Sequence, residues 1–213
     1  MIKSKKFWIT ILIVMVGNGM CYWFLKLFQS NYHYIYFFLD DKIPFLPRFI
    51  YIYNLFYPVV FISYYLMFKK GNEETFMNCA VSSVVGCFIC YIIFLCYPTI
   101  IDHGIIPSTD KLTKFAIDIT YFFDNPAINC FPSIHCLFCF QVIYGLFKSK
   151  KFNNKLRIFL ILFLLLIAIS TVIVKQHYFV DIIGGFVVCV IANVITIEFD
   201  LYKKIKKKYK IFA

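Results

Sequence analysis

Charged residues are scarce in this 213-residue chain: they make up 15% of it, and Asp and Glu together number only 11. Hydrophobic residues make up 62%, whereas about 45–50% is usual in soluble domains. This composition excludes an ordinary soluble domain and predicts an all-α protein that crosses the membrane several times. The length suits one compact bundle, so we expect a single integral membrane domain over residues 1–213.

Metal-site patterns are also missing. The chain has nine cysteines, but no Cys-x-x-Cys pair stands with histidines at the spacing of a zinc site. Cys87 and Cys90 lie in the middle of an apolar run, and most of the other cysteines lie in such runs too. There they behave as small apolar residues. We therefore expect no metal site and no cofactor.

No separate basic domain is present, although the formal net charge is +11. The lysines and arginines flank the apolar runs, as they do in the cytoplasmic loops of membrane proteins. Nucleic-acid binding is therefore not expected. No apolar run carries a stripe of charged residues either, which argues against an ion channel.

The hydrophobic pattern predicts a bundle of six transmembrane helices, since roughly 20 apolar residues cross a bilayer. They cover residues 7–28, 49–68, 76–97, 132–147, 158–174 and 178–197. The first run follows three lysines and could be a signal peptide. It is too long for the apolar region of one and lacks a small-residue cleavage site, so we expect a retained span.

The distribution of Lys and Arg predicts the orientation of these spans. With the N-terminus in the cytoplasm, the inner segments hold sixteen of the 22 basic residues. This pattern predicts that both termini are cytoplasmic and that residues 98–135 and 175–181 face outward. We expect the protein in the plasma membrane, with its active site on the external side.

The first of two polar segments on that face is Pro132-Ser133-Ile134-His135, at the start of a predicted helix. Proline is favoured in the first helical turn, and the free N–H groups and helix dipole there favour an anion. Ser133 adds a donor, and His135 could give a proton to the same anion. On its own, such a segment is usually only a helix N-terminus.

The second segment has His177 and Asp181 four residues apart, which on a helix places both on one face. A carboxylate there can accept the Nδ1–H of the imidazole and leave the other nitrogen free as a nucleophile or base. Taken together, the segments favour phosphoryl transfer through a phosphohistidine, in which the second histidine protonates the leaving oxygen. No metal is needed if hydrogen-bond donors neutralise the phosphate oxygens.

These residues resemble the type 2 phosphatidic acid phosphatase superfamily, whose membrane members act on lipid phosphates. Pro132-Ser133-Ile134-His135 is similar to its second motif, and Ser170-Thr171 followed by His177 and Asp181 is similar to its third. The surrounding residues resemble the subgroup close to inositol phosphorylceramide synthase. The similarity covers about residues 98–185, within a phosphatase-like core at about 76–200.

The resemblance implies a role for each of four residues. His177 would be the nucleophile and Asp181 its orienting partner. His135 would be the acid for the leaving group, and Ser133 would bind phosphate.

The sequence departs from the family pattern at the cations that usually hold phosphate. Thr171 stands where the third motif has Arg, and the first motif is degraded, with His103 after Pro98-Thr99. Lys175, one turn beyond Thr171 on a continuing helix, is a possible substitute, although it could also be an interfacial lysine with a buried stem. We expect Lys175, Thr171 and His103 to contact phosphate. Lys111 and Lys114 are more distant candidates.

The sequence thus predicts a metal-independent phosphatase for lipid monophosphates or diphosphates. Two alternatives stay open. An alcohol acceptor instead of water would make the protein a phosphotransferase, and the degraded first motif also fits a non-catalytic lipid-phosphate binder or transporter. The expected partners are the lipid substrate and the bilayer; no oligomeric state is predicted.

Overall fold

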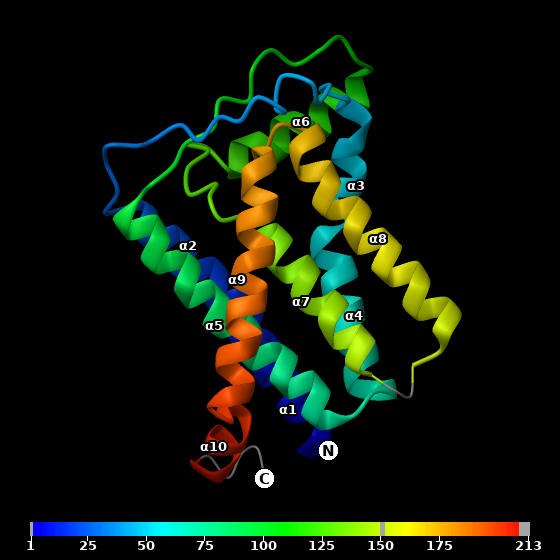
Figure 1. Cartoon of the computed structure of the whole chain (residues 1–213). Coiled ribbons are helices and arrows are strands. Elements are labelled where there is room, and N and C mark those ends of the chain that lie inside the picture. Colours follow the sequence, from blue (N-terminus) through cyan, green and yellow to red (C-terminus); the bar gives the residue numbers. More distant parts are fainter. Residues whose placement is uncertain (1, 150–151, 209–213) are drawn as a thin grey trace.

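The computed structural model describes residues 2–149 and 152–208, which form a bundle of helices (Figure 1). No strand occurs in this part of the chain, and its extended segments meet only at two isolated bridges, one of which pairs Ile100 with Ile128. The all-α prediction is therefore confirmed.

The N-terminal helix is continuous but contains a π-helical stretch, η1, between α1 and α2. A short 3₁₀ turn, η2, precedes α3. In chain order the elements are α1 (Ile2–Ile11), η1 (Leu12–Gly17), α2 (Asn18–Lys26), η2 (Pro47–Phe49), α3 (Ile50–Asn54), α4 (Phe56–Lys70), α5 (Glu73–Cys96), α6 (Lys111–Phe123), α7 (Ile134–Lys148), α8 (Asn154–Ile173), α9 (Phe179–Glu198) and α10 (Leu201–Lys208).

Among the described residues, five helices are long and apolar enough to cross a membrane. They are Lys5–Lys26, Pro47–Lys70, Glu73–Cys96, Asn154–Ile173 and Phe179–Glu198. The predicted fourth span is the shorter apolar helix α7, which has 15 residues and so rises only about 22 Å. It is short because Phe131, Pro132 and Ser133 stay in the loop before it. The predicted count of six is therefore not confirmed.

Helix α7 lies at the centre of the bundle, where it packs against α4, α5, α8 and α9. Its Leu137, Val142 and Leu146 side chains have no exposed surface. Gly185 of α9 lets that helix approach the first turn of α7, since a Cβ there would lie 2.8 Å from the Ser133 carbonyl oxygen. The packing thus brings the two predicted motifs together.

Polar residues cap four helices at their starts. The side chains of Asn72, Asp110, Ser133 and Asn153 each accept a hydrogen bond from a backbone N–H in the first turn of α5, α6, α7 and α8 respectively. Such caps satisfy donors that a helix start leaves unpaired, so these sequence positions determine where the helices begin.

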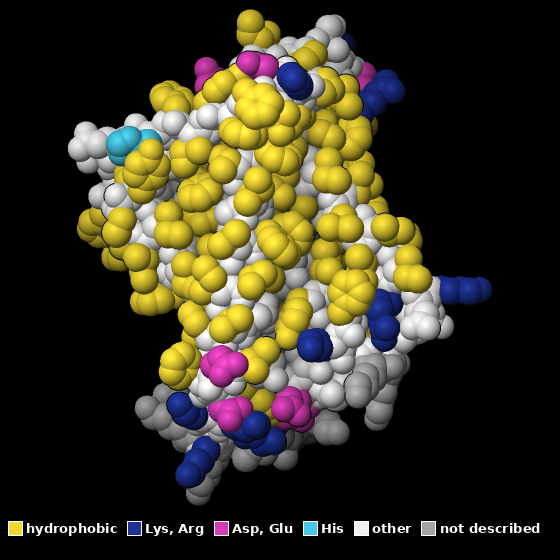
Figure 2. All heavy atoms as spheres, viewed as in Figure 1, with side chains coloured by type: hydrophobic (Ala, Val, Ile, Leu, Met, Phe, Trp, Pro, Cys, Tyr) yellow, Lys and Arg dark blue, Asp and Glu magenta, His cyan; other side chains and the backbone are white. Residues whose placement is uncertain are grey.

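The outer surface of the bundle is apolar. In the view of Figure 2, hydrophobic side chains cover the middle of the molecule, and charged side chains gather at its two ends. Leu12, Phe88 and Leu162 are among the large apolar side chains exposed there. This surface suits the lipid of a bilayer. Helices α1 and α10 lie at the same end (Figure 1); that this end is cytoplasmic stays a prediction.

Candidate active site

The loop before α7 is fixed by Thr99, in the region where the first motif was expected. The Thr99 carbonyl accepts a hydrogen bond from Asn129 N at 2.7 Å, and its hydroxyl accepts one from Phe131 N at 3.0 Å. Asn129 has a φ of 61°, in the left-handed region that Asn adopts more readily than most residues. Thr99 therefore holds the chain that brings the Cys130 carbonyl and α7 to the site.

A tight turn after α8 positions the second polar segment, which contains His177 and Asp181. Lys175 has a φ of 55°, and the backbone N–H groups of Gln176 and His177 both donate to the Thr171 carbonyl, at 2.9 and 3.1 Å. A residue in this conformation is a common way to end a helix. The turn reverses the chain, so Gln176 and His177 lie beside α7 instead of continuing α8.

The two histidines and Asp181 form a hydrogen-bonded chain. His135 Nδ1 lies 3.2 Å from His177 Nε2. His177 Nδ1 lies 3.2 Å from Asp181 Oδ2 and 3.1 Å from the Cys130 carbonyl oxygen. Since both groups next to Nδ1 are acceptors, this nitrogen carries the proton. Nε2 of His177 therefore has the free lone pair, and His135 Nδ1–H donates to it.

Asp181 is itself held in place. Its Oδ2 also accepts a hydrogen bond from the backbone N–H of Tyr178 at 2.8 Å, and its side chain has no exposed surface. The Asp181 carbonyl accepts from Ser133 N at 3.1 Å, which joins the start of α9 to the start of α7. A buried carboxylate with these contacts fixes both the tautomer and the orientation of His177.

Tyr53 and Gln176 extend the chain beyond His135. Tyr53 Oη lies 3.2 Å from His135 Nε2 and 3.4 Å from Gln176 Oε1. With neutral His135, the Tyr53 hydroxyl donates to Nε2. If His135 gains a proton, Nε2–H donates to the Tyr53 oxygen, and the Tyr53 hydroxyl then donates to Gln176. The two side chains can thus serve either protonation state of His135.

These groups open onto a cavity of about 500 Å³. Its wall includes four members of the hydrogen-bonded chain just described: His135, His177, Tyr53 and Gln176. The remaining wall comes mainly from the N-terminal helix and from α6 with the loop that follows it. Their lining residues include Asn18, Tyr22, Trp23, Thr120, Phe123, Asp124 and Asn129.

Asp124 brings a carboxylate into the same cavity. Tyr22 Oη donates to Asp124 Oδ1 at 3.3 Å, and Lys26 Nζ lies 3.5 Å from the same oxygen. Burial raises the pKa of Asp124, and the nearby Lys26 and His177 oppose that increase. The cavity thus combines an imidazole pair with a carboxylate whose proton affinity is higher than usual.

Two of the predicted phosphate contacts are buried beside the cavity and do not line it. The Ser133 hydroxyl oxygen accepts from Cys136 N at 3.2 Å and caps α7. The Thr171 hydroxyl donates to the Ala168 carbonyl at 2.7 Å. Neither residue has exposed surface. Their contact with phosphate stays a prediction.

The other two residues predicted to contact phosphate, Lys175 and His103, instead bind loop and turn residues at the end of the bundle. The Lys175 ammonium donates to the carbonyl oxygens of Asp40 and Ile43, at 3.0 and 2.7 Å. His103 stacks on Tyr121, with ring centroids 3.8 Å apart, and its Nδ1 lies 2.8 Å from the Lys175 carbonyl oxygen. Lys175 therefore holds the loop of residues 40–43, and His103 contacts the turn after α8. Lys114, a more distant candidate, pairs with the exposed Asp118 at 2.7 Å.

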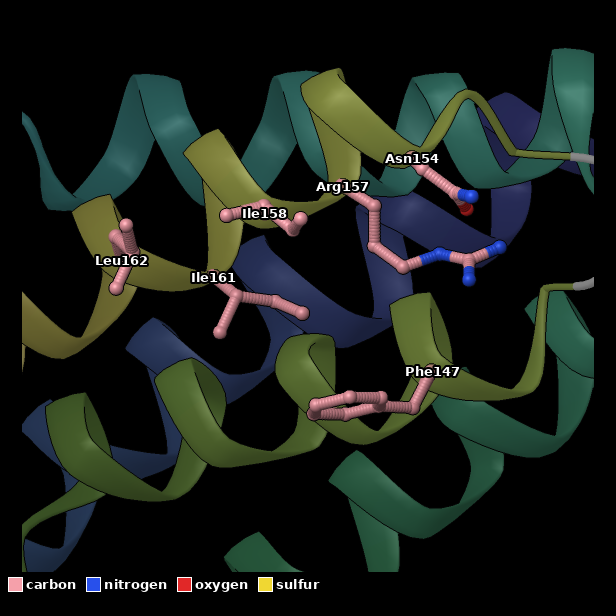
Figure 3. A pocket seen from close by; sticks show the side chains of 6 residues that line it. All are labelled: Phe147, Asn154, Arg157, Ile158, Ile161 and Leu162. Carbon is pink, nitrogen blue, oxygen red and sulfur yellow. The ribbon is translucent and has the colours of Figure 1, made fainter.

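A second hollow of about 320 Å³ lies between α7 and α8 at their other ends (Figure 3). It is lined mostly by apolar side chains, with Arg157 and Asn154 at its edge. The Arg157 guanidinium donates to the Ser149 carbonyl at 2.6 Å and so holds the α7–α8 connection. This hollow contains neither an imidazole nor a carboxylate, which distinguishes it from the histidine cavity.

Sequence reasoning did not identify Tyr53, Gln176 or the pairing of Tyr22 with Asp124. One feature of the sequence could have marked Gln176 as a site residue, namely that it directly precedes His177. Tyr53 lies in an aromatic-rich helix where nothing marks one tyrosine among several, and Asp124 was one of several charges in a long loop. Their role emerges only from the tertiary structure.

Comparison with known proteins gives one match. The family model of the PAP2 superfamily matches residues 32–195. No curated protein and no solved structure has significant similarity to the chain.

Proposed function

The chain belongs to the PAP2 superfamily, and from this premise we propose that it is a membrane phosphatase for lipid monophosphates or diphosphates. The observation that carries the proposal is the hydrogen-bonded chain from His135 through His177 to Asp181 at the wall of a cavity. The apolar outer surface of the helix bundle also supports the proposal, because it suits a protein whose substrate arrives from the bilayer. The likeness to the inositol phosphorylceramide synthase subgroup stays a prediction.

The proposed reaction begins with His177. Its Nε2 lone pair attacks phosphorus and forms an N–P bond, while the P–O bond to the lipid breaks. Protonated His135 gives its proton to the leaving oxygen, and Asp181 stabilises the positive charge that develops on His177. Water, deprotonated by the now neutral His135, then attacks phosphorus and breaks the N–P bond. Phosphate leaves and both histidines return to their starting states.

The geometry of the site adds a requirement. Reacting atoms come within about 3–3.5 Å before reaction, and the acid must reach the leaving oxygen on the opposite side of phosphorus. The two histidine nitrogens must therefore stand roughly 6 Å apart in the complex, against 3.2 Å here. We expect the phosphate group to separate the imidazoles and take the place of their mutual hydrogen bond.

The membrane setting forms part of the proposal. The excess of Lys and Arg in alternate loops favours cytoplasmic termini, which would place the histidine cavity at the external end of the bundle. We propose that the protein acts in the plasma membrane on the outer leaflet.

Release of inorganic phosphate from lipid phosphates tests the proposal. Purified protein in detergent with EDTA is compared with His177→Ala and with His33→Ala, a matched control at an exposed histidine that stacks on Tyr97. We expect release by the unaltered protein and by His33→Ala, and none by His177→Ala. Equal release by His177→Ala would refute the mechanism, and release that EDTA abolishes would refute metal independence.

A phosphotransferase is the second candidate, favoured by the carboxylate in the cavity wall. Asp124 lines the cavity together with the imidazoles, and its carboxylate can accept a hydrogen bond from an alcohol. An alcohol bound there could take the phosphoryl group from His177. Faster turnover with an added lipid alcohol, and a new lipid product, would identify this activity. Binding of the lipid without either reaction would indicate a non-catalytic binder.

A further inference from the structure

The histidine cavity lacks the cations with which phosphate sites usually neutralise their ligand. Of the described residues that line it, none is Lys or Arg, and Asp124 contributes a carboxylate. The Lys175 ammonium is bound to the carbonyl oxygens of Asp40 and Ile43, and Lys26 is directed to Asp124 and to the Pro126 carbonyl. The described residues that line the cavity thus offer a doubly charged phosphate no permanent cation, and only the proton that His135 can carry.

Gln176 offers the cavity a neutral donor. Its side chain lines the cavity beside His177 and is 2% exposed. Its Oε1 interacts with Tyr53 Oη, whereas its amide nitrogen, Nε2, has no hydrogen-bond partner among the described residues. A buried amide with two unused N–H groups is uncommon, because losing the hydrogen bonds of water without replacement is unfavourable. A ligand oxygen in the cavity would satisfy them.

We propose that the Gln176 amide binds the phosphoryl oxygens where related enzymes use a cation, and that the site takes lipid phosphate groups carrying a single negative charge. The proposal rests on the phosphohistidine chemistry above and changes the preferred substrate from a doubly charged monoester or a diphosphate to a singly charged monoester or a diester. Hydrogen bonds from neutral donors are about half as strong as charge-assisted ones. An amide can therefore hold one charge on phosphorus, but it does not compensate a second charge near Asp124.

Two kinds of lipid present this chemistry. A phosphomonoester loses its second proton with a pKa of about 6 and is singly charged below that pH. A phosphodiester keeps one charge at higher pH as well. The bonds that change are those of the proposed reaction: His177 Nε2 bonds to phosphorus, the lipid oxygen leaves with the proton of His135, and water then displaces His177.

Phosphatidic acid and phosphatidylmethanol form a matched pair of probes, because they share the diacylglycerol leaving group and differ by one methyl ester and one charge. The measurement is diacylglycerol formed by the full-length protein in detergent, at about pH 8, where the monoester is almost fully doubly charged. We expect kcat/KM to be at least about tenfold higher for phosphatidylmethanol, the value of roughly one charge-assisted hydrogen bond. A preference for phosphatidic acid at this pH would overturn the proposal.

Three variants test the roles of Gln176 and Asp124. Gln176→Lys supplies a cation and Asp124→Asn removes the opposing charge, so each should move the ratio of the two kcat/KM values toward phosphatidic acid by about tenfold. Gln176→Met, of similar length without the amide, should lower turnover of both lipids. An unchanged ratio in Gln176→Lys, in a protein with an unaltered unfolding temperature, would show that the amide does not face phosphate.

A pH series separates the two lipid sources. If the natural substrate is a protonated monoester, phosphatidic acid turnover rises relative to phosphatidylmethanol as the pH falls toward about 6. The ratio of the two rates removes the titration of the protein, which both lipids experience. The ionisable side chains around Gln176 in the cavity are Tyr22, Tyr53, Tyr57, Asp124, Cys130, His135 and His177.

Binding to His177→Ala distinguishes a failure of this inference from a failure of the proposed reaction. That variant lacks the nucleophile but keeps Gln176 and Asp124, so it should bind phosphatidylmethanol more tightly than phosphatidic acid at about pH 8. If the unaltered protein and all variants bound phosphatidylmethanol selectively but turned over neither lipid, the phosphohistidine mechanism would be refuted. The charge selectivity would still hold. Equal binding of both lipids would refute the selectivity.

Discussion

Replacing Gly185 with alanine should disturb both the bundle and the reaction. The added Cβ would lie 2.8 Å from the Ser133 carbonyl oxygen, 2.9 Å from Cys136 Cβ and 3.0 Å from Leu137 N. Two of these three atoms belong to the backbone of the loop and first turn of α7, so no side-chain rotation can remove the contact. Since ordinary contacts begin at 3.4 Å, α7 and α9 must separate by about 0.6 Å at this point, the difference from 2.8 Å.

The magnitude follows from two opposing effects. Overpacking of this kind costs about 1–3 kcal/mol, and alanine is favoured over glycine within a helix by about 0.5–1 kcal/mol. We expect a net destabilisation of about 1–2 kcal/mol. The same movement shifts His135 on α7 relative to Asp181 on α9. Because a displacement of about 1 Å can cost about 100-fold in rate, we expect turnover to fall by about tenfold.

Gly17→Ala is the matched control, since a Cβ there would meet only the Leu12 carbonyl oxygen, at 3.9 Å. Both variants are unfolded by heat in the same detergent and assayed for phosphate release. Gly17→Ala should be as stable as the unaltered protein or slightly more stable, with full activity. If Gly185→Ala behaved in the same way, close contact between α7 and α9 would not be what aligns the catalytic groups.

Two further predictions follow from individual contacts, and a third follows from the predicted orientation. Asp181→Asn should lower turnover by about 10²–10⁴-fold, because the amide no longer selects the Nδ1–H tautomer of the nucleophile; rapid-quench measurement of the phosphohistidine checks this. Asp40→Ala should cost about 1–3 kcal/mol of stability in thermal unfolding, because the carboxylate accepts from the first N–H of α9 at 2.7 Å. In sealed cells, a membrane-impermeant maleimide should label Ile105→Cys and not Glu74→Cys; the opposite result would reverse the predicted orientation.

Much of the fold could be predicted because a membrane-spanning helix appears in the sequence as an apolar run of about 20 residues. Helix starts are predicted less well: Asn153 caps the start of α8, whereas the apolar run predicts that span only from residue 158. At α7 the span is predicted from residue 132, whereas the helix begins at Ile134. Hydrophobicity alone does not distinguish a helix from the buried loop before it, whose backbone is held by Thr99.

The sequence argument about the polar segment of His177 and Asp181 relied on helical geometry that the structure lacks. His177 lies before α9, which begins at Phe179, so it does not share a helix with Asp181. The two meet because Asp181, in the first turn, reaches back to the preceding residues. Lys175 was expected to point the same way as Thr171 on a continuing helix, but α8 ends at Ile173. The four-residue spacing therefore predicted the contact between His177 and Asp181 correctly, but not because the two residues share a helix. The same spacing placed Lys175 beside Thr171, and the turn after α8 prevents that arrangement.

The cavity could not be inferred from the family motifs because part of its wall lies outside the matched region. The family match begins at residue 32, whereas Asn18, Tyr22 and Trp23 of α2 line the cavity. Tyr22 donates to Asp124 and to the Ile128 carbonyl, at 3.3 and 2.9 Å, so α2 also fixes the loop that leads to the second motif. The histidines are supplied by the shared core, while the space and charge that a substrate meets depend on contacts with the N-terminal helix. A comparison restricted to motif residues would therefore miss the part of the cavity wall that α2 supplies.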